Sequence, residues 1–210
     1  MKKTKKLFMT VLALVMAVSM SLCFCSCGSE EPAEEEAGMP NPVHECESAD
    51  DIAQATGISL DAPEGAEDVA YSYIDAAEED GYPIAQVLFT LDGQEFCYRC
   101  QMTDEVSITG ITDEEADPED LTQELNDQTK IGAELAGIYS EWESAATTMV
   151  SYCDAVCAFN EGKEGFVAWL DVVPGALYSL SVDKGAKQDV LAKTAEKCFV
   201  PMQGDSDGDE

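Results

Sequence analysis

The chain has 210 residues, enough for one domain with a hydrophobic core or for two small ones. Its 43 acidic residues outnumber 11 basic ones, and the resulting net charge of -32 repels phosphate, which argues against nucleic acid as a partner. The single histidine, His44, excludes any site that needs two histidines, whereas a hydrophobic content of 45% excludes disorder throughout the chain.

The N-terminus has the features of an export signal. Lysines occupy four of the first six positions, an apolar segment follows over Leu7–Phe24, and small residues flank Cys27. The sequence Phe24-Cys25-Ser26-Cys27 resembles the lipobox of bacterial lipoproteins, in which the signal is cleaved before a cysteine that carries a diacylglyceryl group. We therefore predict a signal peptide over residues 1–26 and lipidation at Cys27. An uncleaved membrane anchor and a plain secreted protein are the alternatives.

A lipidated, acidic linker follows over residues 27–42, with proline and few groups that a core could bury. At about 3.3 Å per extended residue, it lets the next domain stand up to roughly 45 Å from the membrane. We expect that domain over residues 43–203 and an acidic tail over residues 204–210. The predicted location is the outer face of the cytoplasmic membrane, with the lipid bilayer as a partner through the acyl anchor.

The domain begins with a short helix. Ser48 can cap its first turn, and Gly57 can end it, because glycine adopts the left-handed conformation that closes a helix. A strand is expected next, at about Asp68–Ile74.

A β-hairpin is the strongest local prediction in the chain. Apolar and polar residues alternate over Ile84–Leu91 and over Glu95–Met102. Asp92-Gly93 between them favours a tight turn, because both central positions of that turn need a positive φ. The alternation places Cys97 and Cys100 on opposite faces of the second strand.

Residues 112–130 form an acidic block with few large apolar groups, which predicts an exposed insertion. Asp117-Pro118 could begin a helix within it, with Leu121 and Leu125 on one face.

Strands are expected to resume after Ile138. Alternating residues predict strands over Cys153–Phe159, Phe166–Val172 and Tyr178–Val182, and a closing helix is expected at about Ala186–Phe199. The predicted buried stripe of that helix consists of Val190, Leu191, Ala195 and Cys198. The two tryptophans, Trp142 and Trp169, lie on strand-like segments and are expected in the core.

These elements predict an α+β fold. We expect a single antiparallel β-sheet domain, with a short N-terminal helix and a C-terminal helix packed on one face. Helices are expected only at the two ends, and no glycine-rich phosphate-binding motif occurs.

Six cysteines remain after the signal peptide and the lipidated Cys27, and an even number in an exported chain indicates disulfides. In extended strands, Cys97 and Cys100 would be about 10 Å apart, and Cys153 and Cys157 about 13 Å, beyond the reach of a disulfide. Bridges would therefore join different elements, and buried free thiols are the alternative. The six candidate disulfide or thiol residues are Cys46, Cys97, Cys100, Cys153, Cys157 and Cys198.

Two other uses of the cysteines compete with disulfides. Cys97-Tyr98-Arg99-Cys100 has the spacing of a thiol-disulfide redox motif, but that chemistry needs a cysteine at a helix N-terminus, and this one is expected in mid-strand. Together with Cys153 and Cys157 the pair could also hold zinc, although neither spacer resembles a turn. No cofactor and no metal ligand set are therefore expected.

Several segments resemble a family of uncharacterised lipoproteins from Gram-positive gut bacteria, built on a domain of unknown function. The resemblance runs in order, with gaps, from Asn41 to Asp205 and implies a small α+β lipoprotein domain without assigned catalytic residues. The matching segments are Asn41-Pro42, Ser48–Gly57, Pro63-Glu64, Tyr98-Arg99, Gly137–Trp142, Ala168–Asp171, Pro174–Ser181 and Pro201–Asp205.

No catalytic constellation stands out. The leading hypothesis is a membrane-tethered, non-enzymatic binding or interaction module for an unknown protein or small-molecule ligand. A thiol-based redox or metal-binding protein that uses Cys97/Cys100 and Cys153/Cys157 is the alternative. A hydrolase with two catalytic carboxylates is a third possibility.

Overall fold

The structure is a computed structural model that describes residues 42–77, 81–103, 118–173 and 175–201. The predicted signal peptide, the lipidated Cys27, nearly all of the linker and the acidic tail lie outside the described residues. Within the described part of the chain, no helix is long and apolar enough to cross a membrane.

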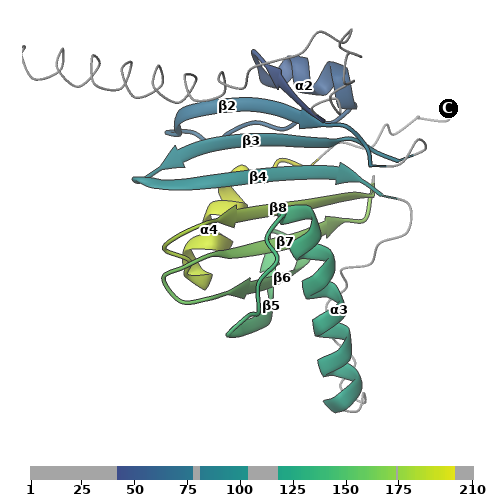
Figure 1. Cartoon of the computed structure of the whole chain (residues 1–210), viewed down its shortest axis with the longest axis vertical. Helices are drawn as coiled ribbons and strands as arrows, with labels where there is room; N and C mark the ends of the chain where they lie inside the picture. Colours follow the sequence, from purple (N-terminus) through teal and green to yellow (C-terminus); the bar gives the residue numbers. More distant parts are fainter. Residues whose placement is uncertain (1–41, 78–80, 104–117, 174, 202–210) are drawn as a thin grey trace, which may run out of the picture. The chain divides into compact units, whose positions relative to one another are not determined.

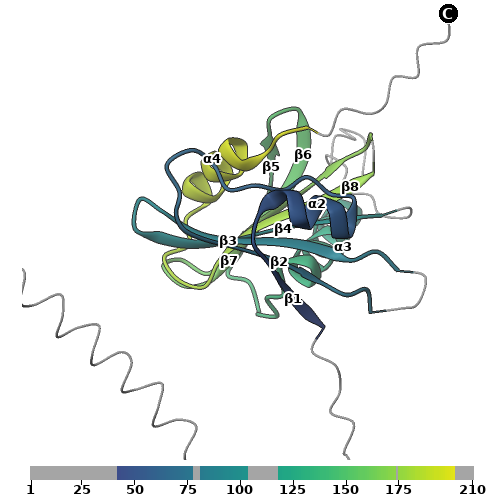
Figure 2. The same ribbon diagram turned by 90° about the horizontal axis from the view of Figure 1, so that it is seen from above.

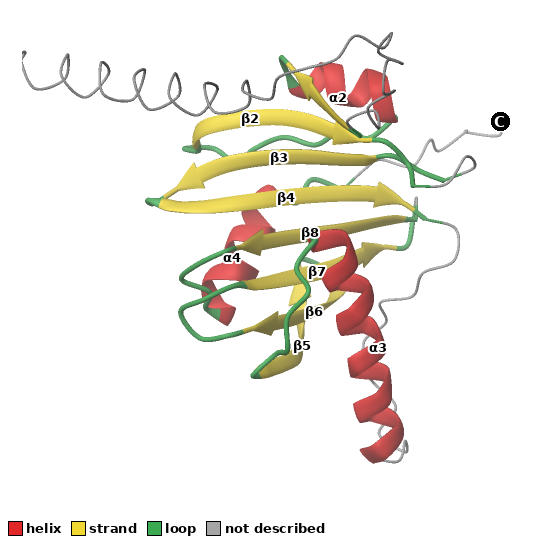
Figure 3. Ribbon diagram, viewed as in Figure 1, coloured by secondary structure: helices red, strands yellow, loops and turns green. Residues whose placement is uncertain are grey.

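Eight strands form one antiparallel sheet in the order β1-β2-β3-β4-β8-β7-β6-β5, which confirms the α+β class (Figure 1). The strands are β1 (Val43–Cys46), β2 (Glu67–Ile74), β3 (Ile84–Leu91), β4 (Gln94–Met102), β5 (Ser144–Val150), β6 (Cys153–Phe159), β7 (Gly165–Asp171) and β8 (Ala176–Val182). The helices are α2 (Ala49–Thr56), α3 (Pro118–Ala136) and α4 (Gln188–Cys198) (Figure 3). The two groups of four strands join where β4 pairs with β8, from Cys97↔Ser181 to Met102↔Ala176.

Both ends of α2 are set by the predicted caps. The Ser48 hydroxyl accepts a hydrogen bond from the Asp51 backbone N–H, and the Asp51 carboxylate accepts one from the Glu47 N–H. At the other end Gly57 has a φ of 76° and donates its N–H to the Ala53 carbonyl at 2.9 Å. The helix is therefore closed by local interactions, as its sequence predicts.

The β3–β4 hairpin is confirmed along its whole length. Asp92 and Gly93 form its turn with φ values of 53° and 80°, as the favoured two-residue turn requires. On β4, Tyr98 and Cys100 are buried in the core, whereas Cys97 lies on the opposite face. The alternation in the sequence thus assigns the face of each residue correctly.

Both faces of the sheet carry a hydrophobic cluster, because neighbouring residues of one strand point to opposite sides. Val167 and Trp169 of β7 belong to the cluster that also contains Leu191 of α4, and Phe166 and Ala168 belong to the cluster beneath α3. Helices α4 and α3 accordingly lie on opposite sides of the strands (Figure 2). The prediction that helices occur only at the two ends of the domain is wrong.

Helix α3 corrects the prediction of an exposed insertion within residues 118–130, the part of that segment that the structure describes. It begins at Pro118, as expected, but Gln128 and Thr129 are buried, and the helix continues onto the sheet as far as Ala136. A Cβ at Gly132 would lie 2.5 Å from a ring carbon of Phe166, so the missing side chain permits a close approach of helix and sheet. Helix α3 packs on the sheet through small residues. A sequence analysis that looks for large apolar residues therefore does not predict that this helix is partly buried.

Helix α4 is confirmed, with one change in its buried stripe. Leu191, Ala195 and Cys198 are buried, and Thr194 is buried with them. Val190 is 37% exposed, so its assignment to the stripe is wrong. Positions three and four apart share a helix face, whereas Val190 is turned by about 100° from Leu191.

Candidate functional site

The six cysteines of the domain are free thiols in this structure. Cys97 and Cys100 lie on opposite faces of β4, and Cys153 and Cys157 share one face of β6 four positions apart. The strand assignments that separate each local pair are confirmed. Disulfides between different elements stay a prediction of the sequence.

Burial makes most of these thiols poor nucleophiles. It raises the pKa of Cys157 and of Cys198 to about 12. It also raises the pKa of Cys153 to about 11, with help from the negative charges of Asp171 and Asp154. Because the thiolate is the reactive form, such thiols pack as small apolar side chains.

Cys97 lies outside both hydrophobic clusters, and its thiol donates to the side-chain oxygen of Gln86 at 3.7 Å. Cys97 lines a hollow of about 570 Å³ on the sheet face opposite α2, together with Leu88 and Ser181. Burial raises the pKa of its thiol, although Arg99 and Ser181 act in the opposite direction. In the described residues, no three side chains of histidine, cysteine, aspartate or glutamate come together as a group that could hold a metal ion.

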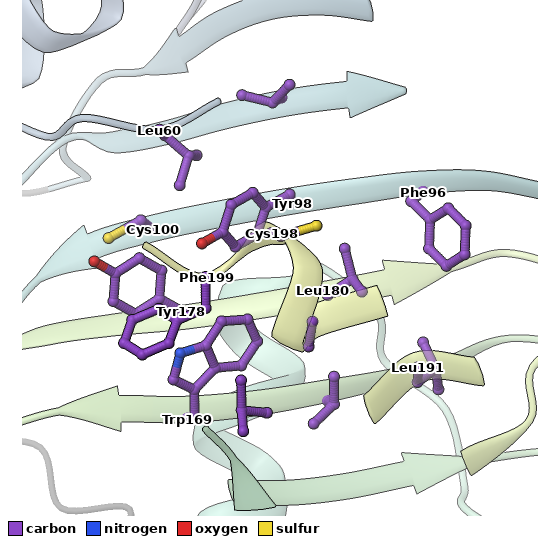
Figure 4. Close-up of a cluster of buried hydrophobic side chains, with 14 of the residues drawn as sticks. Leu60, Phe96, Tyr98, Cys100, Trp169, Tyr178, Leu180, Leu191, Cys198 and Phe199 are labelled. Carbon is purple, nitrogen blue, oxygen red and sulfur yellow. The ribbon is translucent and has the colours of Figure 1, made fainter. Parts of the chain in front are cut away.

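An aromatic cluster surrounds the thiols of the larger core (Figure 4). Tyr98, Trp169 and Tyr178 stack across three neighbouring strands with ring centroids between 5.4 and 6.1 Å apart. Phe199 meets Trp169 and Tyr178 edge-on, at 5.8 and 5.3 Å. Trp169 is fully buried, which confirms that it belongs to the core and offers no platform to a ligand.

The site with the best form for a ligand is a groove of about 780 Å³ beside α3, called here the α3 groove. One wall is the helix, and the other is the chain segment that leads from α3 back towards β5 (Figure 3). The lining residues are Gln123, Asn126, Thr129, Lys130, Ala133, Glu134, Ile138, Tyr139, Ser140, Glu141 and Trp142. Apolar and aromatic walls with a few convergent polar groups are typical of binding sites.

A helix-ending motif fixes the start of the returning segment. Gly137 has a φ of 72° and donates its N–H to the Glu134 carbonyl, and the Ile138 N–H donates to the Ala133 carbonyl, both at 3.1 Å. This pair of bonds defines the Schellman motif, which reverses the chain direction at the end of a helix. The segment therefore runs back alongside α3.

Asn160 holds the far end of the same segment. Its amide donates to the Glu141 carbonyl at 3.1 Å and to a Glu164 carboxylate oxygen at 2.7 Å, while its side-chain oxygen accepts from the Glu143 N–H at 2.8 Å. Asn160 is itself 5% exposed. A buried side chain with three hydrogen bonds keeps the segment close to the turn that follows β6.

The two aromatic residues of the groove differ in exposure. Trp142 is half-buried and meets Phe166 edge-on, with ring centroids 5.2 Å apart. It lies in the segment before β5, not on a strand as expected. Tyr139 is 81% exposed although its segment is fixed at both ends. An aromatic ring held in solvent by a rigid segment is available to a ligand at little entropic cost.

Hydrogen bonds also organise the polar wall on α3. Gln123 donates to both carboxylate oxygens of Asp127 at 3.0 Å, and Lys130 donates to the same carboxylate at 3.1 Å. These bonds lower the pKa of Asp127. The groove therefore presents amide, hydroxyl and carboxylate groups beside two aromatic rings.

The sequence did not predict this groove. The sequence analysis named Trp142 as a core residue and Gly137–Trp142 as a segment of the family resemblance. The groove forms because that segment returns alongside α3, which the sequence does not reveal. The one local signal is Gly137, because a glycine at the end of a helix favours the left-handed conformation that reverses the chain direction.

Comparison with known proteins finds no family that matches the chain, no similar curated protein and no similar solved structure. The resemblance to uncharacterised lipoproteins therefore stays a prediction from the sequence. The functional proposal depends on the geometry of the α3 groove.

Proposed function

We propose that this protein is a membrane-tethered extracytoplasmic lipoprotein whose domain is a non-enzymatic binding module, and that the α3 groove takes the ligand. The observation that carries the proposal is Tyr139, an 81% exposed ring on a segment that hydrogen bonds hold at both ends. Tyrosine offers a large, rigid contact area with a polar tip, and such rings are enriched where proteins bind partners.

The proposal places the anchor at Cys27 and the domain beyond the acidic linker. It also places the two terminal helices on one face of the sheet, which is supported by the presence of Ile52 from α2 and Leu191 from α4 in one buried cluster. The opposite face is then left to α3 and its groove. Burial raises the pKa of all four thiols that the thiol-based alternative would use, Cys97, Cys100, Cys153 and Cys157, which does not favour that alternative.

A ligand screen by thermal shift on residues 28–210 tests the binding function, because a ligand of the native state raises the unfolding temperature. Soluble oligosaccharides and short peptides are suitable libraries. A ligand of the groove should stabilise the wild type and lose its effect in Tyr139→Ala. Tyr152→Ala is the matched control, because Tyr152 is a 60% exposed tyrosine on the β5–β6 turn. A ligand that stabilises both variants equally would move the site away from the groove.

A further inference from the structure

We propose that the free edge of β5 binds an extended segment of a partner protein, rich in lysine or arginine, as an added ninth strand. β5 contributes no residue to the lining of the α3 groove, and the proposal does not depend on the function assigned to that groove.

β5 is an edge strand of seven residues that pairs with β6 alone among the described strands. Its pairing is regular from Ser144↔Phe159 to Val150↔Cys153. The other edge of the sheet, β1, has only four residues and includes His44 and Glu45. Of the two edges, β5 is the longer.

The turn after β5 shows which of its backbone groups are free. Val150 and Cys153 pair across a two-residue turn in which Ser151 has a φ of 56°. In such a hairpin the residues that flank the turn exchange hydrogen bonds, and every second residue before them does the same. The N–H and C=O groups of Ala145, Thr147 and Met149 therefore point away from β6 and can pair with another chain.

β5 also lacks the usual protection of an edge. Its sequence, Ser-Ala-Ala-Thr-Thr-Met-Val, contains no charged residue, although charged residues make up 26% of the chain. Proteins normally block an edge with lysine, proline, a bulge or a very short strand. β5 has none of these, so its free groups can add a strand, which is a common mode of peptide recognition.

Helix α3 provides a platform for the added strand. Its 19 residues make it about 28 Å long. It contacts the strands from β4 to β5, which span about 19 Å at ~4.8 Å per gap. The helix is therefore roughly 9 Å longer than the part of the sheet that it crosses, and Figure 1 shows its N-terminal part beyond β5. A ninth strand would lie against this overhang.

The negative charge beside the β5 edge favours a partner strand with basic side chains. The described charged side chains in this part of α3 are Glu124 and Asp127 against a single lysine, Lys130, and the chain as a whole carries a net charge of -32. A second copy of this chain would bring an equally acidic helix to the same edge and would be repelled. A strand with basic side chains on its α3-facing side would instead be attracted, because complementary charge both speeds encounter and excludes wrong partners.

The test uses the full chain in neutral detergent and a short peptide in which lysine alternates with threonine. Hydrogen exchange should slow at Ala145, Thr147 and Met149 when the peptide is added, and the affinity should fall as salt is raised. A peptide in which glutamate replaces lysine is the matched control and should bind at least tenfold more weakly.

A proline on β5, at a position whose N–H points away from β6, tests whether the peptide pairs with this edge. Thr147→Pro removes one outward N–H and leaves the bonds to β6 in place, so it should weaken peptide binding at least tenfold, whereas Thr147→Val should not. Met149→Pro serves in its place if Thr147→Pro fails to fold. Equal binding by the proline and valine variants, protection outside β5, or dimerisation of the chain through β5 would each overturn the proposal.

Discussion

The guanidinium group of Arg99 binds the end of α3, where its Nη1 donates to the Leu135 carbonyl at 3.0 Å. On the sheet, its Nε donates to the side-chain oxygen of Gln86 at 2.8 Å, and the Gln86 amide donates to the Ser72 hydroxyl at 3.0 Å. A cation at a helix C-terminus is favourable because the last carbonyls carry partial negative charge. Arg99 therefore links the C-terminal end of α3 to the sheet. The segment that forms the second wall of the α3 groove begins at this end of the helix.

Arg99→Met should lower the free energy of unfolding by about 2 kcal/mol, because it removes hydrogen bonds from a charged donor. Urea denaturation measures the change. Lys130→Met is the matched control, because it removes an ion pair between side chains that are 75% and 55% exposed. That pair should be worth about 0.5 kcal/mol or less. Equal losses in the two variants would show that Arg99 does not hold α3.

Gly137→Ala should be more costly than Gly162→Ala, although both glycines have nearly the same φ, 72° and 71°. The left-handed conformation costs alanine about 1–2 kcal/mol at either position. At Gly137 the new Cβ would also lie 2.5 Å from Arg99 Nη1, whereas at Gly162 nothing lies within 4 Å.

A double-mutant cycle separates the two effects of Gly137→Ala. Combined with Arg99→Met, the substitution should cost only as much as Gly162→Ala, because the guanidinium is gone. If the excess cost persists in the double variant, displacement of Arg99 is not its cause.

Leu191→Ala should destabilise the domain by about 2–4 kcal/mol, through lost burial and the cavity left behind. Leu191 is 1% exposed and belongs to the larger core cluster. The adjacent Val190→Ala, at a position that is 37% exposed, should cost about 0.5 kcal/mol or less. An unchanged denaturation midpoint for Leu191→Ala would mean that α4 does not pack on the sheet in solution.

The domain should lose stability as pH rises above 9. Burial raises the pKa of Cys157 from an ordinary value of 9.0 to about 12, so between these values the unfolded thiol loses its proton and the folded thiol keeps it. The unfolded state is then favoured by about 1.4 kcal/mol per pH unit for each such thiol.

The stability difference between the wild type and Cys157→Ala should therefore shrink as pH rises from 8 to about 10.5. Urea midpoints across this range measure it. Leu191→Ala is the control, because leucine does not titrate and its cost should change little with pH. A constant cost for Cys157→Ala would show that this thiol does not contribute to the pH dependence.

If Cys27 carries the proposed lipid anchor, Cys27→Ala should abolish labelling by a fatty-acid analogue and release the protein from the membrane fraction. Cys25→Ala is the matched control, since Phe24 precedes Cys25 where a lipobox has a small residue. If the Cys27→Ala protein is still labelled and still sediments with membranes, lipidation at this residue is wrong.

Signals between residues close together in the chain determined several elements of the fold. Ser48 and Gly57 bound α2, and Asp92-Gly93 sets the turn of the β3–β4 hairpin. The alternation along each strand also assigned the two faces correctly, including the opposite faces of Cys97 and Cys100. These features depend on backbone conformation and on the two-residue period of a strand, both of which are local properties.

Only the tertiary structure decided where α3 lies and which strands meet across the middle of the sheet. The β4–β8 pairing joins Cys97 to Ser181, which are far apart in the sequence, and no local pattern specifies it. Gly132 brings α3 close to Phe166 because it lacks a side chain, so hydrophobicity does not reveal the contact. The α3 groove and the overhang beside β5 both follow from that packing, because they depend on distances between segments that meet only in the folded chain.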